Sequence, residues 1–332
     1  MKALQVVKYG DIDSSLAFND IPKPKVSANQ VLIQVKAASI NPIDRMILAG
    51  QLKKYRKCNL PFTLGYDVSG IIVDKGSNVE DLSLGDEVYS RVPTNQPGTF
   101  AEFVAVDSDV VFTMPTNVNF SQAAALPLVG LTVIQAMRKA GLKKDDRILI
   151  HAGSGGVGSI GIQYAKSKGA YVYTTTSTGN IEWVKSLGAD RVIDYKKEDY
   201  KAVARDLDIV FNSLGDTYSL DAFDLLKKGG KVNSITGSID NETAKEMGLN
   251  FFVRMILAIQ AKNIVKKAKT SSTSYRFTAM DPTKKDLKLL TSLVEEGKLK
   301  PIVGKEYSFE NAIEAIKFQS EGHSRGKVII NF

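Results

Sequence analysis

Three glycines of this chain are spaced in a way that could bind a phosphate group. Gly153, Gly155 and Gly158 match the pattern G-x-G-x-x-G, between a short apolar run that ends at Ile150 and a helical pattern. In a strand–turn–helix unit the first glycine allows a tight turn, the second lets the backbone approach a pyrophosphate, and the third lets the helix pack closely on its strand. The free N–H groups and positive dipole end of the helix would then face the phosphate charge. The pattern alone is weak, because a glycine-rich turn in another βα unit would look the same.

The residues that follow the next expected strand indicate which dinucleotide would fit. A fold that selects NAD usually places Asp or Glu about 20 residues after the glycines. Residues 171–180 contain no acid, and Glu182 is the first acidic residue after the glycine pattern. Ser177 and Thr178 could instead donate hydrogen bonds to a 2′-phosphate, which a carboxylate would repel. The sequence therefore predicts a preference for NADPH.

The elements that must position these residues change in kind along the chain. Residues 1–120 contain short strand patterns, including 1–7, 31–35 and 68–73, and frequent glycines separate them. This pattern is typical of a small, barrel-like all-β domain. A helical stretch begins at residues 121–125, and strands then alternate with helices. Alternation of this kind predicts a parallel, doubly wound sheet.

Five strands are expected in this sheet, and the pattern changes again near Asp281. The expected strands are residues 148–151, 171–176, 192–193, 209–211 and 231–235. Beyond Asp281 we expect helices at 284–296 and 309–318 and a closing strand at 327–331. A strand after a complete doubly wound unit suggests that the chain returns to its first domain.

Composition limits the classes of protein to which the chain can belong. Its 332 residues suffice for about two domains of roughly 150 residues, and 43% hydrophobic with 24% charged residues suits a globular protein with a full core. No apolar run reaches the ~18 residues of a membrane span, so we expect no membrane partner. The N-terminus lacks the features of a signal peptide, and a single cysteine, Cys58, excludes an internal disulfide. These features favour a reducing, cytoplasmic location.

The positive net charge raises the question of a nucleic-acid partner. The formal charge is +8 and the pI is about 9.2. The lysines are scattered, however, and the densest run, residues 262–269, is short. No nucleic-acid-binding motif accompanies the charge, which favours a solvated basic surface over a nucleic-acid partner.

Several segments spread over nearly the whole chain resemble one family. They lie at residues 38–44, 64–70, 98–103, 131–132, 153–158, 186–190 and 326–330. Through them the chain is similar to the medium-chain dehydrogenases/reductases, in the zinc-free branch of quinone and enone oxidoreductases, which includes alkenal reductases. The resemblance implies an α/β protein: a GroES-like β-barrel catalytic domain at residues 1–124 and 281–332, and a Rossmann cofactor domain with a doubly wound parallel sheet at 125–280. It allows a monomer or a homodimer.

The resemblance also implies a cofactor site for NADPH. Two of its positions depart from the family pattern, because Asn180 stands where close relatives carry Lys and His323 where many carry Arg. Both changes remove a fixed positive charge, so the preference for NADPH should be modest. Arg325 could compensate, or it could simply be solvated. The cofactor-binding residues implied are Gly153, Ser154, Gly155, Gly156, Val157, Gly158, Ser177, Thr178, Asn180, Tyr195, Leu214, Thr236 and Arg325.

Two residues are expected to act on the substrate. The resemblance places Asn41 at the mouth of the nicotinamide pocket and Thr132 facing the nicotinamide. Asn-Pro is also a turn former, and Thr132 could be an ordinary helix residue. Asp44 is expected to have a structural role, as a helix-capping residue. We expect catalytic roles for Asn41 and Thr132.

The substrate pocket is expected to include Met46, Tyr66 and Phe252. Tyr66 could instead be a buried phenol at a strand end, and its neighbour Asp67 is expected to be structural. Phe252 belongs to an apolar stripe with Phe251, Met255 and Ile256. Such stripes usually form a core or an interface, although in this family the equivalent region tends to cover the substrate cleft.

The metal ligands that zinc-dependent relatives use are nearly absent from this sequence. Cys58, His151 and His323 are the only cysteine and histidines, and they are scattered. Three such ligands cannot form a tetrahedral N/S site, so we expect no metal. The first zinc-ligand position of the metal-dependent relatives is occupied here by the Asn41-Pro42 turn.

These residues predict hydride transfer to the β-carbon of an enone or alkenal, or to a quinone. Neutral donors would have to hold the enolate oxygen: the Asn41 amide, the Thr132 hydroxyl, the cofactor ribose and N–H groups of residues 51–57. Two alternatives remain. One is one-electron quinone reduction, which forms semiquinones; the other is a catalytically idle NADPH-binding protein that acts in stress or RNA binding.

Overall fold

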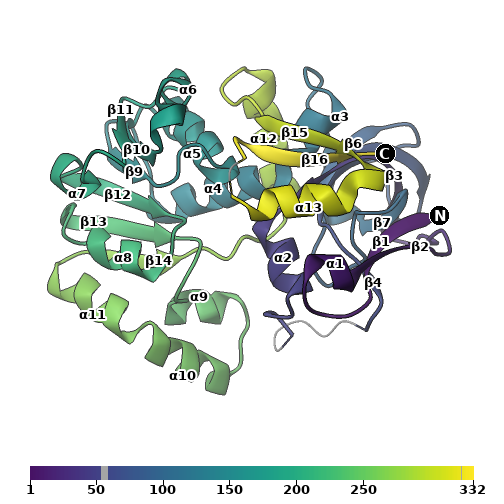
Figure 1. Ribbon diagram of the computed structural model, residues 1–332, viewed down its shortest axis with the longest axis horizontal. Helices are drawn as coiled ribbons and strands as arrows, with labels where there is room; N and C mark the ends of the chain where they lie inside the picture. Colours follow the sequence, from purple (N-terminus) through teal and green to yellow (C-terminus); the bar gives the residue numbers. More distant parts are fainter. Residues whose placement is uncertain (54–58, 323) are drawn as a thin grey trace. The chain divides into compact units, whose positions relative to one another are not determined.

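The computed structural model describes residues 1–53, 59–322 and 324–332. The chain folds into two compact units (Figure 1). Unit 1 comprises Met1–Leu131 and Pro282–Phe332, and unit 2 comprises Thr132–Asp281. The boundary predicted at residues 124 and 125 lies earlier than the division in the structure, because helix α3 (Phe120–Ala124) and the first residues of α4 (Pro127–Ala140) still belong to unit 1.

Unit 1 consists mainly of β-strands. One sheet has the order β15-β16-β3-β5-β6-β8, with β7 also paired to β3, and a three-stranded sheet has the order β2-β1-β4. The core is formed by apolar side chains of these strands and by fully buried aromatic residues such as Phe100. The strands are β1 (Lys2–Val6), β2 (Leu16–Asp20), β3 (Gln30–Ile40), β4 (Phe62–Thr63), β5 (Asp67–Lys75), β6 (Glu87–Arg91), β7 (Phe103–Asp107), β8 (Val111–Thr113), β15 (Val303–Ser308) and β16 (Lys327–Asn331).

The C-terminal segment completes unit 1, as the sequence predicts. β16 pairs antiparallel with β3, with Val328 opposite Ile40 and Ile330 opposite Ala38, and parallel with β15. The helix expected at 309–318 begins as a short 3-10 turn, η3 (Phe309–Asn311), and continues as an α-helix. This continuation is α13 (Ala312–Ser320). The other helical elements of this unit, besides α3 and the first residues of α4, are α1 (Ile12–Ser15), α2 (Pro42–Leu48), η1 (Ser108–Val110) and α12 (Lys284–Glu295).

Unit 2 contains a six-stranded sheet in which every pair is parallel, in the order β11-β10-β9-β12-β13-β14. Counted from β9, this is the order 3-2-1-4-5-6 of a doubly wound dinucleotide-binding fold. The five predicted strands are confirmed to within a few residues at their ends. The strands are β9 (Arg147–Ile150), β10 (Tyr171–Thr176), β11 (Arg191–Asp194), β12 (Leu207–Asn212), β13 (Leu226–Ser234) and β14 (Ser274–Phe277).

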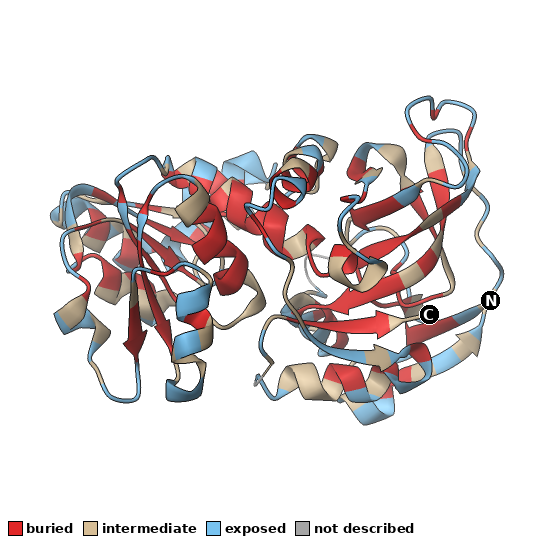
Figure 2. Cartoon of the chain, turned by 90° about the horizontal axis from the view of Figure 1, so that it is seen from above, coloured by how far each residue is buried: buried red, intermediate tan, exposed pale blue. Residues whose placement is uncertain are grey.

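The sequence analysis missed β14, the sixth strand. It is short and lies at the edge of the sheet, and Tyr275 is its only buried side chain, so it lacks the apolar run that marks the other strands. Figure 2 shows how much of the sheet is buried. The helical elements of this unit, besides most of α4, are α5 (Gly156–Ser167), η2 (Thr178–Asn180), α6 (Ile181–Ser186), α7 (Tyr200–Val203), α8 (Asp216–Ala222), α9 (Asn241–Glu246), α10 (Phe251–Gln260) and α11 (Lys262–Thr270).

The described residues form no helix that combines the length and the apolar character needed to cross a bilayer.

Candidate functional site

The predicted glycine loop lies between β9 and the N-terminus of α5. A Cβ atom added to Gly158 would lie 2.2 Å from the carbonyl oxygen of Ala152, so only glycine lets the helix pack this closely on the loop. A Cβ on Gly155 would lie 3.4 Å from the same oxygen, which is an ordinary contact and leaves the outer side of the loop accessible. Gly155 is also the N-cap residue of α5 and has no side chain that could cap the helix. The first N–H groups of α5 therefore remain for an anionic ligand.

The tight turn predicted at Gly153 is formed by its neighbour Ala152. The left-handed backbone conformation of this loop belongs to Ala152, with φ of 55°. Gly153 is required for another reason, because a Cβ there would lie 2.3 Å from Oγ1 of Thr174 on β10. The glycine thus permits contact between the loop and the neighbouring strand, and a non-glycine residue takes the strained conformation.

The other cofactor residues predicted for unit 2 lie where further strands end. Ser177 follows β10, Tyr195 follows β11, Leu214 follows β12 and Thr236 follows β13. Since neighbouring strands are parallel, all these positions lie with the glycine loop after β9 along the side of the sheet where the carboxyl ends of the strands meet. Ligands of doubly wound sheets bind at these carboxyl ends, at the point where the strand order changes direction. Here that point lies between β9 and β12, because β10 and β11 follow on one side of β9 and β12 to β14 on the other.

The two hydroxyl groups expected to bind a 2′-phosphate differ in this structure. The Thr178 hydroxyl donates to Oδ2 of Asp194 at 2.6 Å. Because a hydroxyl has one hydrogen, the predicted donation from Thr178 to a phosphate conflicts with this bond. Ser177 instead accepts a hydrogen bond from Nδ2 of Asn180 at 3.1 Å, so its own hydrogen can be donated. The Ser177 hydroxyl thus keeps a hydrogen to donate, whereas the hydrogen of Thr178 is held by Asp194.

Two lysines near this position escaped the sequence analysis. Asp194 ends β11 and is followed by Tyr195, Lys196 and Lys197. The hydrogen bond from Thr178 lowers the pKa of Asp194, and the positive charges of Lys197 and Lys196 lower it further. Tyr195 N donates to the carbonyl oxygen of Thr176 at 3.1 Å, which holds this segment against the end of β10. The two exposed lysines thus add positive charge beside Ser177.

In unit 1, the Asn-Pro turn begins α2. Asn41 is the N-cap residue and Pro42 the first helical residue. The backbone N–H of Asn41 donates to Oδ2 of Asp44 at 2.7 Å, so Asp44 has the expected capping role. Both side chains are buried. This local arrangement follows from the residue types, since proline is preorganised for the first helical position and lacks an N–H that would need a partner.

The side chain of Asn41 belongs to a buried polar cluster. Its Nδ2 atom donates to Oδ2 of Asp67 at 2.9 Å and to the carbonyl oxygen of Ser39 at 3.4 Å. Its Oδ1 atom accepts a hydrogen bond from the Lys327 ammonium, which also donates to Ile40 O at 2.9 Å. Both amide hydrogens and the amide oxygen of Asn41 are therefore engaged. The prediction of a free amide donor conflicts with this arrangement, because one of these bonds would have to be exchanged first.

Asp67 is the central carboxylate of this cluster. Its Oδ2 atom accepts from the Ser39 hydroxyl at 2.9 Å, and its Oδ1 atom accepts from Leu128 N at 3.1 Å. Arg91 Nε and Lys327 Nζ each lie 3.8 Å from one of its oxygens. Asp67 is structural, as expected. The cluster balances two carboxylates, Asp44 and Asp67, against the two cations, and all four side chains are buried.

Burial is the main cause of the pKa shifts in this cluster. It raises the pKa of Asp44 above the usual range of a carboxyl group, and it lowers the pKa of Lys327. The attraction between opposite charges opposes both shifts. Oδ1 of Asp44 is buried and accepts no hydrogen bond. The Asp44 carboxyl group thus has one oxygen without a hydrogen bond, and burial disfavours its ionised form.

The remaining predicted residues are found in different environments. Tyr66 is fully buried, and its ring lies 5.1 Å from the Arg91 guanidinium, so the structure supports the buried phenol rather than the pocket wall. Thr132 is 5% exposed and lies in α4. Met46 on α2 is 40% exposed, and Phe252 on α10 is 73% exposed. Arg325 lies in unit 1, just before β16, and is exposed.

His151 follows β9 and is buried between two tyrosine rings, those of Tyr200 and Tyr218, whose centroids each lie 5.2 Å from its own. Burial lowers its pKa to about 4. Its Nδ1 atom lies 3.4 Å from the Thr175 hydroxyl. The imidazole is therefore neutral at physiological pH and is part of the interior of unit 2.

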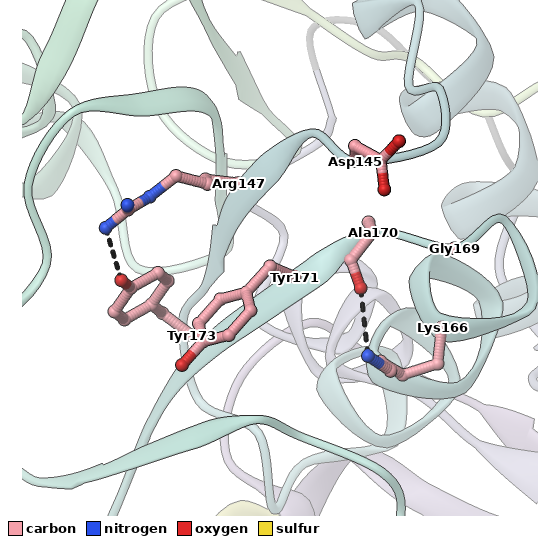
Figure 3. Close-up of a pocket in the computed structure, with 7 residues that line it drawn as sticks. All are labelled: Asp145, Arg147, Lys166, Gly169, Ala170, Tyr171 and Tyr173. Atoms are coloured by element: carbon pink, nitrogen blue, oxygen red, sulfur yellow. Dashed lines mark hydrogen bonds between the residues drawn. The ribbon is translucent and has the colours of Figure 1, made fainter.

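A cavity of about 520 Å³ in unit 2 lies away from the predicted cofactor residues (Figure 3). It is lined by residues at the start of β9 and β10, among them Arg147 and Tyr171, and by Lys166 near the end of α5. The beginnings of these strands are at the edge opposite to the glycine loop. Lys166 is bound there to Ala170 O and to Asp190. We assign this cavity no part in cofactor binding.

Within residues 1–53, 59–322 and 324–332, no three His, Cys, Asp or Glu side chains come together to form a metal site. The buried cluster around Asp67 does contain two carboxylates, but the cations of Arg91 and Lys327 already balance them. A dication would face two fixed positive charges there, so this donor set does not fit zinc. Cys58, His323 and most of the loop at 51–57 lie outside the described residues.

Comparisons with known proteins match most of the chain. Residues 27–116 match the alcohol dehydrogenase GroES-like domain, and residues 187–330 match a family model described as zinc-binding dehydrogenase. The 2-methylene-furan-3-one reductase of Solanum lycopersicum is 34% identical over 100% of this chain and 79% of its own length. The chloroplast envelope quinone oxidoreductase homolog of Arabidopsis thaliana is 32% identical over 99% of this chain and 98% of its own.

A solved structure supports the same conclusion over the full length. The quinone oxidoreductase from Coxiella burnetii is 33% identical, covers 100% of this chain and 99% of its own, and superimposes with a TM-score of 0.86. With its GroES-like domain, its doubly wound sheet and these full-length relatives, the chain belongs to the medium-chain dehydrogenase/reductase superfamily, among the quinone and enone oxidoreductases.

Proposed function

We propose that the protein is an NADPH-dependent reductase that transfers hydride to the C=C bond of α,β-unsaturated carbonyl compounds, or to quinones, without zinc. One observation carries this proposal: the glycine loop leaves the N-terminus of α5 accessible at the ligand-binding edge of a doubly wound sheet. The names of the relatives supply the substrate class, since they include a furanone reductase, an NADPH-dependent alkenal/one oxidoreductase and quinone oxidoreductases.

The residues of unit 2 can hold the phosphate groups of this cofactor. The first N–H groups of α5 would face the pyrophosphate. The Ser177 hydroxyl, fixed by Asn180, would donate to the 2′-phosphate, and Lys196 and Lys197 would supply the positive charge that Asn180 does not. When bound, NADPH supplies the hydride. Arg325 is a further candidate for the phosphate, and Tyr195, Leu214 and Thr236 for the neighbouring parts of the cofactor.

The residues assigned to the substrate must stabilise charge on its carbonyl oxygen. Conjugate reduction moves negative charge to that oxygen, where neutral donors can hold it. We assign Thr132 to this role first. Asn41 can contribute by redirecting the hydrogen of its longer bond, the one of 3.4 Å to Ser39 O, while Asp67 and Lys327 keep the amide in place. Met46 and Phe252 are proposed to line the substrate pocket.

The regiochemistry of hydride transfer tests this proposal. The enzyme would be given NADPH deuterated at the transferred position, together with an enone, an alkenal and a quinone. A saturated ketone or aldehyde with deuterium at the β-carbon is the expected product. An allylic alcohol deuterated at the carbinol carbon would show carbonyl reduction instead, which usually requires a metal or a proton-donating phenol, and would overturn the proposal.

A measurement of metal content tests the zinc-free assignment separately. We expect the purified protein to contain no stoichiometric zinc and to keep its activity in the presence of a chelator. One zinc per chain, with activity lost on its removal, would contradict the assignment. It would also point to ligands outside the described residues, such as Cys58 or His323.

A further inference from the structure

The two helices that precede β14 form a surface of which the proposed reaction uses only Phe252. α10 exposes five large apolar side chains, with Phe251 70% and Ile259 66% exposed. Large contiguous apolar surfaces of this kind usually mark a site of interaction. The exposed apolar residues of α10 are Phe251, Phe252, Met255, Ile256 and Ile259.

The second helix of this surface is basic. α11 follows α10 directly after Ala261 and carries Lys262, Lys266, Lys267 and Lys269. Lys267 is paired with Asp224 at 2.8 Å. The other three lysines recur at intervals of four and three residues, so they share one face of the helix. Residues 250–270 contain no Asp or Glu at all.

A groove runs along the basic face of α11. It has a volume of about 400 Å³ and is lined by small or apolar residues, including Ala258, Ala261 and Val265, and by the same three lysines. Ala258 is the one residue of α10 in this lining, which also includes Asn241 of α9, so the groove adjoins the lysines and the exposed apolar side chains of α10 lie outside it. The lysine stems thus extend over apolar surface while their ammonium groups remain in solvent.

The two helices are not equally anchored in unit 2. α11 buries Ile264 and Ala268 in the core of the unit, whereas Leu257 is the only buried residue of α10. In Figure 1, α10 and α11 lie end to end, and α10 is the helix that lies farther from the strands of the sheet. Most of the surface of α10, including its exposed apolar side chains, is therefore not used to pack the helix against the rest of unit 2.

We propose that the α10–α11 surface, residues 251–269, binds the surface of a bilayer that contains anionic lipids. Aromatic and aliphatic side chains enter the boundary between head groups and acyl chains, and lysines pair with the lipid phosphates. The surface combines these two chemistries without any acidic residue. Binding of this kind needs no membrane-spanning helix, and it would place the reductase next to apolar enones or quinones dissolved in the bilayer.

Two other occupants match the surface less well. In a symmetric dimer the same patch would meet itself, so the lysines of one copy would face those of the other. Single-stranded nucleic acid would match the lysines and could stack on phenylalanine, but it offers nothing apolar to Met255, Ile256 and Ile259. An anionic bilayer is the partner that satisfies both halves of the surface.

Sedimentation of the full chain with lipid vesicles tests the proposal. Vesicles of phosphatidylcholine alone are compared with vesicles in which about one third of the lipid is phosphatidylglycerol. We expect the protein to sediment with the anionic vesicles and to remain in solution with the neutral ones, and we expect salt to weaken binding. Equal binding to both vesicles, or binding to neither, would overturn the proposal.

Matched variants identify the surface. Ile256→Glu and Ile259→Glu should abolish binding, and Lys266→Gln and Lys269→Gln should each weaken it about fivefold. Leu84→Glu, at a leucine that is 63% exposed in unit 1, and Lys228→Gln, at an exposed lysine of unit 2, should leave it unchanged. Phe252 is left intact because the proposed function assigns it to the substrate pocket. Thermal unfolding verifies that each variant is folded.

Three results would assign the surface to another role. Loss of a dimer in Ile256→Glu, measured by analytical ultracentrifugation, would assign it to a second copy of the chain. RNA binding that Lys266→Gln abolishes, without vesicle binding, would assign it to nucleic acid. A higher KM for enones in Ile259→Glu, again without vesicle binding, would assign it to the substrate site. Each of them contradicts the membrane proposal, and none depends on whether the natural substrate is an enone or a quinone.

Discussion

Asn41 and Gly155 occupy equivalent places in their own units, each as the N-cap residue of a helix next to a predicted site, but their surroundings differ. Around Asn41 every polar atom of the side chain has a partner, supplied by Asp67, Ser39 and Lys327. Gly155 has no side chain, and the N–H groups of α5 that follow it are left to a ligand. The N-terminus of α2 and the buried cluster around Asn41 form a closed site, whose polar groups are satisfied by the protein itself. The N-terminus of α5 and the neighbouring residues 177–180 and 196–197 form an open site, whose N–H groups are left for a ligand. The difference separates residues that set stability from residues that set affinity.

Removing the cation of the closed site should have the largest effect. Lys327→Met leaves Asp67 with one fewer counter-charge in a buried position and deprives Asn41 Oδ1 of its donor. We expect the free energy of unfolding to fall by about 3–5 kcal/mol, because one partner of a buried ion cluster is lost. Urea unfolding measures this loss. Lys25→Met, at an exposed lysine of the same unit, should change stability by less than about 0.5 kcal/mol. Equal effects of the two variants would show that the cluster contributes nothing.

Unit 2 also contains a buried polar group, His151, whose protonation should appear in the pH dependence of the free energy of unfolding. Its pKa is lowered to about 4 in the folded protein by burial, from the usual value of 6.5. As the pH falls below 6.5, the unfolded chain binds a proton that the folded protein does not, so stability is lost between pH 6.5 and pH 4. The loss should amount to about 3 kcal/mol. His151→Gln should lack this part of the acid sensitivity. If the stability of this variant followed the parent protein throughout that range, the histidine would not be the group responsible.

A pair of glycine substitutions separates the two kinds of position within one loop. Gly158→Ala places a Cβ 2.2 Å from Ala152 O and should lower the free energy of unfolding by about 1–3 kcal/mol. Gly155→Ala meets the same oxygen at 3.4 Å, so stability should remain within about 0.5 kcal/mol while NADPH binding weakens. Thermal unfolding and fluorescence titration with NADPH distinguish the outcomes. An alanine at 155 that left NADPH affinity unchanged would argue against the loop as the pyrophosphate site.

The smallest expected effect concerns the exposed charges of the open site. Replacing Lys196 and Lys197 together by Gln should weaken NADPH binding by about 1 kcal/mol and leave NADH binding unchanged, since only NADPH carries the 2′-phosphate. Asn180→Lys should strengthen NADPH binding by a similar amount. Lys185→Gln, at an exposed position on α6, is the matched control. Equal losses for both cofactors would mean that the lysines act at a distance on overall charge.

Much of the fold around the glycine loop could be predicted from the sequence, because backbone requirements leave clear signals. The glycines, the strands before them and the missing acid after β10 are all local patterns, and the structure confirms the strand–turn–helix unit. The return of residues 327–331 to unit 1 was also predictable, from a strand pattern after a complete doubly wound unit. Ala152 was not, because a left-handed alanine carries no signature in the sequence.

The closed site was less predictable because its partners are distant in the sequence. Lys327 and Arg91 each stand at the end of an apolar strand, where a charged residue usually lies in solvent. Their burial depends on Asp67 and Asp44, which the sequence places in other segments. The engagement of Thr178 with Asp194 was missed for the same reason. Spacing along the chain predicts which residues can bind a ligand, but it does not show which of them are already bound to one another.

The position of β16 has a consequence for synthesis on the ribosome. Unit 2 is one continuous stretch, and all six strands of its sheet are synthesised before residues 282–332. Unit 1 cannot complete its sheet until β16 pairs with β3 and Lys327 reaches Asn41. The nascent chain must therefore hold β3, with residues 37–40 of one edge unpaired, while the whole of unit 2 is translated. Premature termination before residue 327 should yield a folded cofactor domain joined to an incomplete, aggregation-prone β-sheet, so completion of unit 1 depends on residues 327–331.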